Sequence, residues 1–354
     1  MKQEIIDKIN RLANQDEPFL FVINYQGDKA FIRQLSDINP EECLFDFEGR
    51  GNSSDEMKNN SEKIAEISWQ IAPPLYEDYE RSFDIVKNNI MAGNSYLTNL
   101  TCKVPVSCNL SLEDIFHRAK GKYKLLLRRK RNLTPFVCFS PETFVRIKNG
   151  RIYSYPMKGT LDASLPDAEK QLMEDRKEAA EHATIVDLIR NDLSRVAENV
   201  RVDKYRYIDV LHTNKGDILQ TSSEISGRLP EDYPHHLGEI LDAQLPAGSI
   251  TGAPKDKTMQ IIQEAEGYDR GFYTGIMGIY DQGELNSAVM IRFIEEETSP
   301  VDFEADGKKN FKASEGMGDE ASRELYFKAG GGITSKSDCR KEYEEVIQKI
   351  YLPF

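Results

Sequence analysis

The sequence has few of the residues that build covalent or metal-bound frameworks. Its five cysteines are odd in number, and no two of them stand at the spacing of a metal-binding pair. Disulfide frameworks need paired cysteines, and zinc sites need several cysteines or histidines close together. The sequence therefore predicts neither kind of framework, and we expect reduced thiols.

Long apolar runs are also missing. No stretch approaches the roughly 20 apolar residues that span a bilayer. Residues 1–8 are polar and acidic, whereas a secretory signal begins with basic residues that an apolar run follows. From these absences we expect a cytoplasmic protein without a membrane partner.

The chain lacks an excess of basic residues. It has 46 lysines and arginines against 59 aspartates and glutamates, and its formal net charge is −13. Nucleic-acid surfaces are basic, so no nucleic-acid partner is expected. An anionic substrate would need local cations or a metal to offset the repulsion. The run Arg128, Arg129, Lys130 and Arg131 is the exception, and we interpret it as a solvated loop.

Hydrophobic periodicity predicts a mixed globular fold. Residues 1–75 are predicted to form strands, including residues 19–25, with a polar loop over residues 52–61. The Asn149-Gly150 pair is a strong signal for a β-hairpin. The other predicted elements are helices from residue 78 and over 167–198 and 338–351, and strands over 96–106, 136–147, 151–157, 275–280, 288–294 and 326–333.

Two pairs of glutamates stand three residues apart on predicted helices: Glu178 with Glu181, and Glu342 with Glu345. Residues at this spacing lie on one side of a helix. Two such helices that face each other would offer four carboxylates to a hard cation, which prefers oxygen ligands. Acidic pairs of this kind are also common on solvated helices, so the spacing alone leaves both interpretations open.

Two further features are suited to binding an anion. Lys349 lies one turn beyond Glu345, where it could hold a substrate carboxylate or form a surface salt bridge. Gly330, Gly331 and Gly332 follow an extended segment, and their backbone N–H groups could approach an anion, although a triple glycine is also typical of a flexible turn.

Lys158 lies between a predicted strand and Gly159. A lysine there is usually a solvated cation, but a buried lysine can lose its proton and become a nucleophile. At pH 7 a lysine with a pKa of about 10.4 is only about 0.04% neutral, so burial or a nearby cation would have to lower its pKa considerably. The segment 246–255, rich in small residues and prolines, predicts a rigid loop at a helix start.

These motifs, in this order, resemble the chorismate-utilising enzymes, a family that includes anthranilate, aminodeoxychorismate, isochorismate and salicylate synthases. The resemblance begins near residue 78 and covers about three quarters of the chain. The matching stretches are residues 92–101, 140–142, 156–160, 177–182, 187–193, 246–255, 329–333 and 342–349.

The resemblance implies an α/β (α+β) fold in which two large antiparallel sheets pack at a steep angle with helices outside. It also implies that residues 1–75 form N-terminal strands and a loop integrated into this fold, and that residues 76–354 form the chorismate-binding catalytic region. The active site would lie between the sheets and the helices.

The resemblance also implies a role for each matching residue. Glu142 would be the general acid that protonates the leaving C4 hydroxyl of chorismate. The implied Mg²⁺ shell, which would hold the ring carboxylate, consists of Glu178, Glu181, Glu342 and Glu345, with Glu181 and Glu345 as direct ligands. The implied substrate-binding residues are Thr160, Tyr273, Arg292, Gly330, Gly331, Gly332 and Lys349.

Lys158 distinguishes between members of the family. Anthranilate synthases carry alanine at this position, whereas aminodeoxychorismate synthase large subunits carry lysine. The resemblance therefore implies amination of chorismate at C4, on the route to p-aminobenzoate and folate, with Lys158 as a nucleophile that attacks C2. Isochorismate and salicylate synthases use a lysine base where this chain has Leu97, which counts against the addition of water.

The source of ammonia is expected to be a separate protein. No cysteine stands in a nucleophile-elbow context with a following histidine and acid, so the chain lacks a recognisable glutaminase site. We expect a separate glutamine amidotransferase subunit, or ammonia from solution. The alternatives are the large subunit of anthranilate synthase and a non-catalytic chorismate-binding protein.

Overall fold

The structure of the protein is a computed structural model that describes residues 1–53, 66–128, 133–213, 216–298 and 323–354. Most of the predicted loop 52–61 lies outside these residues, as do Arg129, Lys130 and Arg131 of the basic run. Arg128 is described, and its Nη1 lies 2.6 Å from Oε2 of Glu113. This end of the run is therefore held by an ion pair.

The described residues form two nine-stranded sheets whose strands pair antiparallel. The first sheet has the spatial order β11 (Met157–Asp162), β13 (Gly216–Arg228), β10 (Arg151–Ser154), β9 (Thr143–Lys148), β16 (Glu284–Val289), β15 (Ile276–Asp281), β1 (Phe19–Ile23) and β2 (Ala30–Gln34), with β12 (Glu198–Thr213) paired to β13.

The second sheet is assembled from strands that are equally scattered along the chain. Its spatial order is β14 (Gly252–Ala253), β6 (Leu97–Cys108), β18 (Arg323–Ile333), β17 (Phe293–Thr298), β8 (Phe136–Ser140), β7 (Tyr123–Leu127), β3 (Cys43–Phe47) and β4 (Arg50–Gly51), with β5 (Trp69–Ile71) paired to β6.

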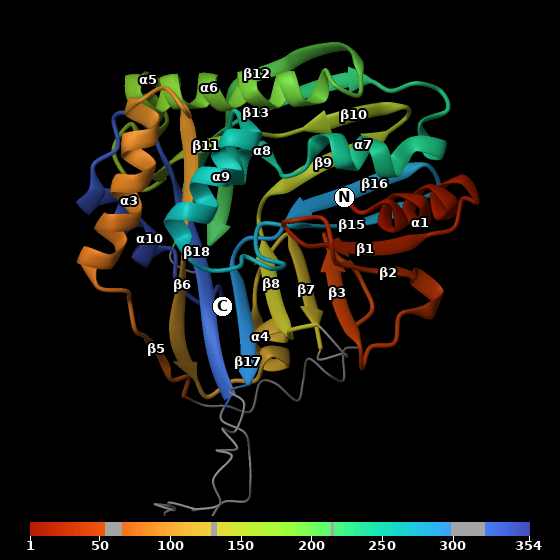
Figure 1. The fold of residues 1–354 in the computed structure, drawn as a ribbon, viewed down its shortest axis with the longest axis horizontal. Coiled ribbons are helices and arrows are strands. Elements are labelled where there is room, and N and C mark those ends of the chain that lie inside the picture. Colours follow the sequence, from red (N-terminus) through yellow and green to blue (C-terminus); the bar gives the residue numbers. More distant parts are fainter. Residues whose placement is uncertain (54–65, 129–132, 214–215, 299–322) are drawn as a thin grey trace, which may run out of the picture.

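The sheets pack face to face and cross steeply. In Figure 1 the strands β1, β15 and β16 of the first sheet run across the view, whereas β6, β18 and β17 of the second run down it. An inter-sheet core fills the space between them, with members such as Leu20, Val22, Phe136, Met277 and Phe293. The predicted architecture of two large antiparallel sheets at a steep angle is confirmed.

Helices cover the outer face of each sheet, as predicted. The helices whose apolar residues share a core with the first sheet are α1 (Gln3–Asn14), α6 (Arg176–Leu193) and α7 (Leu237–Gln244). Those that share a core with the second sheet are α3 (Tyr76–Met91), α4 (Leu112–Arg118), α9 (Lys255–Glu266) and α10 (Cys339–Gln348). The other helical segments within the described ranges are α5 (Ala168–Glu174), α8 (Gly248–Thr251) and the 3₁₀ turns η1 (Leu35–Asp37) and η2 (Tyr233–His236).

The layer arrangement explains the continuous apolar run of β1. Successive side chains of a strand point to opposite faces, and a strand covered on both faces is apolar throughout. In β1, Phe19, Phe21 and Ile23 face the core beneath the helices, whereas Leu20 and Val22 face the inter-sheet core. A helix–sheet–sheet–helix stack therefore needs this kind of strand.

Three predictions about secondary structure were wrong. The predicted helix over 167–198 divides into α5 and α6, because Asp175 is extended between them, and β12 begins at Glu198. The first 75 residues do not contain only strands, because α1 precedes β1 and buries Ile5, Ile9 and Leu12 at helical spacing. The segments predicted as single strands over 136–147 and 288–294 each divide into two strands that belong to different sheets. Local periodicity does not reveal a change of sheet, since the segment stays extended and apolar on both sides of it.

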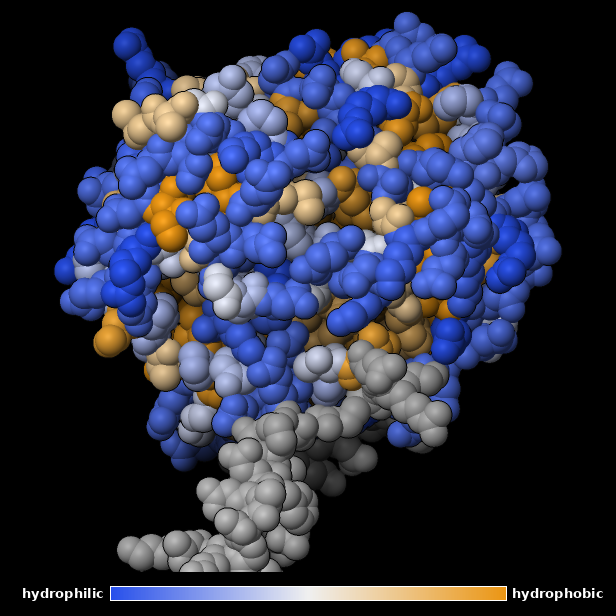
Figure 2. All heavy atoms as spheres, in the orientation of Figure 1, coloured by the Kyte–Doolittle hydropathy of each residue, from blue (hydrophilic) through white to orange (hydrophobic). Residues whose placement is uncertain are grey.

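The surface is consistent with the acidic, polar composition. Figure 2 shows one face covered mainly by hydrophilic side chains, with small apolar patches between them. None of the helices in the described ranges is both long enough and apolar enough to span a membrane.

Candidate active site

Two segments cross from one sheet to the other, and each carries a predicted site residue. Glu142 lies between β8 and β9, and Arg292 lies between β16 and β17, where it adopts a positive φ of 56°. The crossings lie side by side, because the N–H of Phe139 donates to the carbonyl of Arg292 at 3.1 Å and the N–H of Val289 donates to that of Glu142 at 3.2 Å. Both side chains therefore start from the junction of the sheets.

Lys158 is presented by a β-bulge. In the pairing of β11 with β13, Lys158 lies opposite Thr221 and Thr160 opposite Gln220, so Gly159 is the extra residue. Gly159 has a φ of 81°, which suits glycine and is typical of a bulge that redirects a neighbouring side chain. The hydroxyl of Thr221 also donates to the carbonyl of Lys158 and fixes its backbone.

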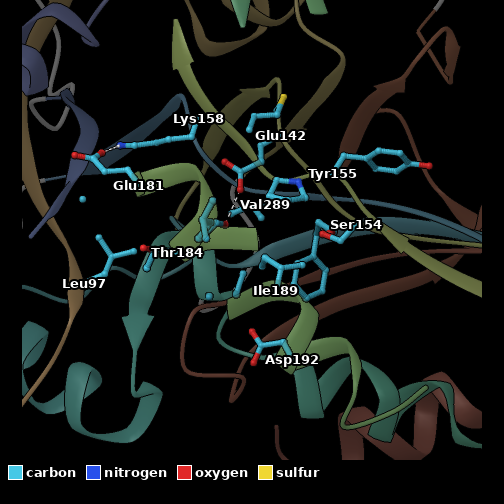
Figure 3. Close-up of a pocket in the computed structure, with 18 of the residues that line it drawn as sticks. Leu97, Glu142, Ser154, Tyr155, Lys158, Glu181, Thr184, Ile189, Asp192 and Val289 are labelled. Carbon is cyan, nitrogen blue, oxygen red and sulfur yellow. Dashed lines mark hydrogen bonds and ion pairs between the residues drawn. The ribbon is translucent and has the colours of Figure 1, made fainter. Parts of the chain in front are cut away.

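The ammonium group of Lys158 lies beside the acidic end of α6. Its Nζ is 2.9 Å from Oε2 of Glu181, the ion pair that is dashed in Figure 3. Burial lowers the pKa of Lys158, but the negative charges of Glu181 and of more distant carboxylates outweigh burial, so its pKa is raised. The expectation of a lowered pKa is therefore wrong for this structure, because carboxylates surround the ammonium.

The four predicted metal ligands come from α6 and α10, and their environment is crowded with negative charge. Burial raises the pKa of Glu178 and of Glu342, and each is raised further by the neighbouring carboxylate on its own helix. Burial also raises the pKa of Glu345, but the ammonium of Lys349, 2.8 Å away, prevails and lowers it. The i, i+4 salt bridge that the sequence left open for Lys349 is therefore formed.

Carboxylate oxygens are the donors that Mg²⁺ prefers. Across the described ranges, however, no three histidine, cysteine, aspartate or glutamate side chains converge closely enough to hold a metal ion. The four glutamates have the oxygen atoms that Mg²⁺ prefers, but they are not arranged as a coordination shell in the structure. The magnesium site therefore stays a prediction.

The glycine triplet lies within a strand and does not form a flexible turn. Gly330, Gly331 and Gly332 belong to β18, and Gly330 lies opposite Thr101 of β6. A Cβ added to Gly330 would lie 2.5 Å from the Thr101 side chain, so close strand packing explains this glycine. The Nζ of Lys349 donates to the carbonyl of Gly330 at 3.0 Å.

Arg292 lies near the same part of β18. The register places Phe293 opposite Lys328, so the crossing that carries Arg292 reaches β18 where the glycine triplet begins. The guanidinium carbon of Arg292 lies 5.5 Å from the ring centroid of Tyr351. Arg292 and the glycine triplet therefore lie in neighbouring parts of the second sheet, and their role in binding the substrate stays a prediction.

Tyr273 and Thr160 occupy contrasting environments. Tyr273 is 3% exposed in the inter-sheet core, 5.9 Å from Phe293 between ring centroids, and burial raises its pKa. Thr160 is exposed on β11.

A cavity of about 490 Å³ lies between the first sheet, α6, the segment that follows α7, and the start of β6 and end of β18 in the second sheet. Figure 3 shows Lys158, Glu181 and Glu142 in the upper part of the view and Asp192 at the bottom, and all four line the cavity. Of the predicted site residues, the cavity is lined by Glu142, Lys158, Glu181 and Gly332. The residues outside its lining are Thr160, Glu178, Tyr273, Arg292, Gly330, Gly331, Glu342, Glu345 and Lys349.

Glu142 has the environment of a proton donor. Burial raises the pKa of Glu142, and the hydrogen bond from Ser249 and the charge of Arg292 offset only part of that rise. A carboxyl group with a raised pKa keeps its proton nearer to neutral pH and can act as a general acid. The bond from the Ser249 hydroxyl to Oε1 of Glu142 is 2.5 Å long.

Sequence reasoning missed a second polar cluster in the cavity wall. Asp192 near the end of α6 pairs with Lys255 at the start of α9 at 2.9 Å, and Lys255 also donates to the carbonyl of Gln244 at 2.8 Å. The small residues and prolines of segment 246–255 predict a rigid loop, but they do not reveal which residues the loop contacts. Ser249 and this ion pair therefore emerged only from the tertiary contacts.

Comparison with known proteins identifies the family. The sequence model of the protein family described as "chorismate binding enzyme" matches residues 13–307. The chain belongs to the chorismate-binding enzyme family. Enzymes of this family convert chorismate, so the cavity between Lys158, Glu142 and Asp192 is the candidate chorismate site.

Relatives of this chorismate-binding enzyme carry several names. An "Uncharacterized PabA-like protein" of Haemophilus influenzae is 46% identical over 99% of this chain and 97% of its own length. The aminodeoxychorismate synthase component 1 of Salmonella typhimurium is 30% identical over 77% of this chain and 56% of its own length. The anthranilate synthase component 1 of Aquifex aeolicus is 34% identical over 59% of this chain and 38% of its own length.

Solved structures agree with the fold. Anthranilate synthase component I of Streptococcus pneumoniae matches with a TM-score of 0.62 and 25% identity, over 81% of this chain and 59% of that one. The menaquinone-specific isochorismate synthase of Escherichia coli matches with a TM-score of 0.67 and 15% identity, over 98% of this chain and 80% of that one. The second likeness concerns the fold alone.

Proposed function

We propose that this chorismate-binding enzyme aminates chorismate at C4 and is the chorismate-binding subunit of an aminodeoxychorismate synthase. The observation that carries the proposal is the position of Lys158, which a β-bulge directs into the cavity that Glu142 also lines. A primary amine and a carboxyl group whose pKa is raised by burial, in one cavity, are the nucleophile and the acid that the reaction needs.

The first step forms a bond between Lys158 and the substrate. The lone pair of Nζ bonds to C2 of chorismate, both ring double bonds move by one position, and the C4–O bond breaks. Glu142 gives its proton to the departing hydroxyl, which leaves as water. Its pKa, raised by burial, suits this role.

The second step restores the lysine. Ammonia bonds to C4, the double bonds move back, and the C2–N bond breaks, so that Lys158 leaves as a neutral amine. The new ammonium at C4 returns a proton to the carboxylate of Glu142, and the product is 4-amino-4-deoxychorismate.

The ion pair of Lys158 with Glu181 belongs to the state of the enzyme before the reaction begins. An ammonium has no lone pair and cannot attack, so Lys158 first gives a proton to Glu181, whose Oε2 lies 2.9 Å from its Nζ, and this contact has to open before the bond to C2 forms. The flanking Lys177, whose Nζ is 3.7 Å from Oε1 of Glu181, offers that carboxylate another cation.

Magnesium belongs to the proposal through the donor chemistry of the two helices. Glu178, Glu181, Glu342 and Glu345 would hold Mg²⁺, which would neutralise the ring carboxylate of chorismate when bound. Arg292 and Lys349 would supply positive charge for the substrate carboxylates, Arg292 with a planar fork that suits two oxygens. The ammonia would come from a separate glutamine amidotransferase subunit or from solution.

The second candidate is the large subunit of anthranilate synthase, which aminates C2. It is favoured by the 34% identity with the Aquifex relative and by the match to the solved anthranilate synthase. A lysine that bonds to C2 occupies the carbon that anthranilate synthases aminate, so the presence of Lys158 favours C4. A non-catalytic chorismate-binding protein would have no need for the Lys158 and Glu142 pair.

Product analysis tests the proposal. The chain is incubated with chorismate, Mg²⁺ and excess ammonium, and the products are identified by mass spectrometry and fluorescence, since anthranilate is fluorescent and aminodeoxychorismate is not. We expect aminodeoxychorismate from the native chain, little from Lys158→Ala or Lys158→Arg, and native turnover from Lys170→Ala on the exposed side of α5. Anthranilate from the native chain would favour the second candidate, and aminodeoxychorismate at the native rate from Lys158→Arg would exclude the covalent role.

A further inference from the structure

Ser249 is the hydrogen-bond partner of the proposed acid. It lies in α8, in the segment that joins α7 to α9, and its hydroxyl donates to Oε1 of Glu142 at 2.5 Å. Both residues line the cavity. Ser249 therefore reaches across from a helical segment to the point where the chain crosses between the sheets.

The segment that carries Ser249 is fixed at its far end. Lys255 binds the side chain of Asp192 and the carbonyl of Gln244, so the residues on either side of the segment are joined by one ammonium. The side chains of Asp192 and Lys255 are only 7% and 11% exposed. Lys255 thereby connects the end of α6 and the end of α7 to the start of α9.

The middle of the segment is fixed as well. Nη1 of the buried Arg270 donates to the carbonyl of Ile250 at 3.0 Å. The carbonyl of Ala253 accepts from the N–H of Tyr96 at 2.9 Å and from the hydroxyl of Ser95 at 3.0 Å. Ser249 thus sits next to a residue that a buried guanidinium holds, and its hydroxyl has a defined position.

We propose that Ser249 is a positioning residue for Glu142: its hydroxyl holds Oε1 and leaves Oε2 to carry the proton to the C4 hydroxyl of chorismate. The inference rests on the proposed role of Glu142 as the acid. A carboxyl group that rotates freely presents its proton in many directions, whereas one held at a single oxygen presents it in one. The cost of losing Ser249 therefore falls on the rate of the chemical step and spares the binding of the substrate.

The charged groups that face Glu142 decide the direction of the effect on its pKa. The charge of Arg292 and the hydroxyl of Ser249 act on its carboxyl group directly, and Lys158, Glu181 and Asp192 line the same cavity. A hydroxyl that donates to the charged form lowers the pKa of a carboxyl group. Removal of the Ser249 hydroxyl therefore raises the pKa of Glu142, whereas a loosened segment that admitted water would lower it.

The test compares Ser249→Ala with Ser249→Thr, which keeps the hydroxyl. We expect Ser249→Ala to lower kcat about tenfold with KM unchanged within about twofold, and Ser249→Thr to recover most of the rate. The pKa of Glu142 is followed through its carboxyl ¹³C resonance, assigned by its absence in Glu142→Gln. It should rise in Ser249→Ala by about half to one pH unit, and Ser249→Thr should match the native protein.

Each outcome decides a different point. Full turnover by Glu142→Gln would show that Glu142 is not the acid, and the proposed function would be wrong. Loss of turnover in Glu142→Gln together with native kcat in Ser249→Ala would overturn only the role of Ser249. A fall in the pKa of Glu142 in Ser249→Ala, or a rise in KM that matches the fall in kcat, would also overturn it, because both are signs of a loosened cavity.

Discussion

The buried ion pair of Asp192 and Lys255 allows a stability prediction that can be worked out from the geometry. The two charged atoms are 2.9 Å apart, and the side chains are 7% and 11% exposed. Removing one partner leaves the other charge buried without compensation, which costs about 3–5 kcal/mol. We therefore expect Lys255→Met and Asp192→Asn each to lower the free energy of unfolding by about this amount.

The double variant Asp192→Asn with Lys255→Met should lose much less than the sum of the two single variants. Neither charge remains, so no uncompensated ion is buried, and we expect a coupling energy of about 2–3 kcal/mol. The free energy of unfolding is measured by urea denaturation followed by circular dichroism. Turnover should fall in the single variants, because the pair fixes the segment that carries Ser249.

A matched control lies on the same helix. Asp187 and Arg190 form an ion pair at 2.7 Å, but their side chains are 71% and 53% exposed. Exposed pairs contribute about 0–1 kcal/mol, so the cycle of Asp187→Asn with Arg190→Met should give a coupling energy below about 0.5 kcal/mol. Equal coupling energies for the two pairs would show that burial of the Asp192 pair does not determine its strength, and the reasoning would be wrong.

Three further predictions concern metal, pH and the nitrogen source. Glu181→Gln and Glu345→Gln should each weaken Mg²⁺ binding at least tenfold by calorimetry, whereas Glu344→Gln, the same change at a neighbouring glutamate of α10 outside the predicted metal shell, should leave it unchanged. Burial lowers the pKa of His117, so the folded state takes up its proton at lower pH than the unfolded state does. The free energy of unfolding should therefore fall as pH drops below about 6.5. His117→Phe should reduce this slope without abolishing it, because burial also lowers the pKa of His182, to about 4. An unchanged slope would exclude His117 as a source of it. Purified chain should use ammonium but not glutamine as the nitrogen source, and turnover with glutamine alone would reveal a glutaminase site.

The sequence by itself determined the features that depend on neighbouring residues. The Asn149-Gly150 pair predicted the hairpin of β9 and β10, and both residues adopt the positive φ values that the turn needs. Glu178 and Glu181 lie on α6, the helix that the hydrophobic periodicity predicts, and their spacing of three residues places them on one side of it. The order of the motifs also pointed to the family, because each motif is a short local pattern.

Only the tertiary structure decided where those patterns meet. The crossings at Glu142 and Arg292 look like uninterrupted strands in the sequence, since both sides are extended and apolar. The raised pKa of Lys158 comes from carboxylates that the sequence places far from it. The bond from Ser249 to Glu142 joins residues 107 positions apart. Strand pairing and charge burial depend on contacts between distant parts of the chain, and local periodicity carries no information about which of those contacts form.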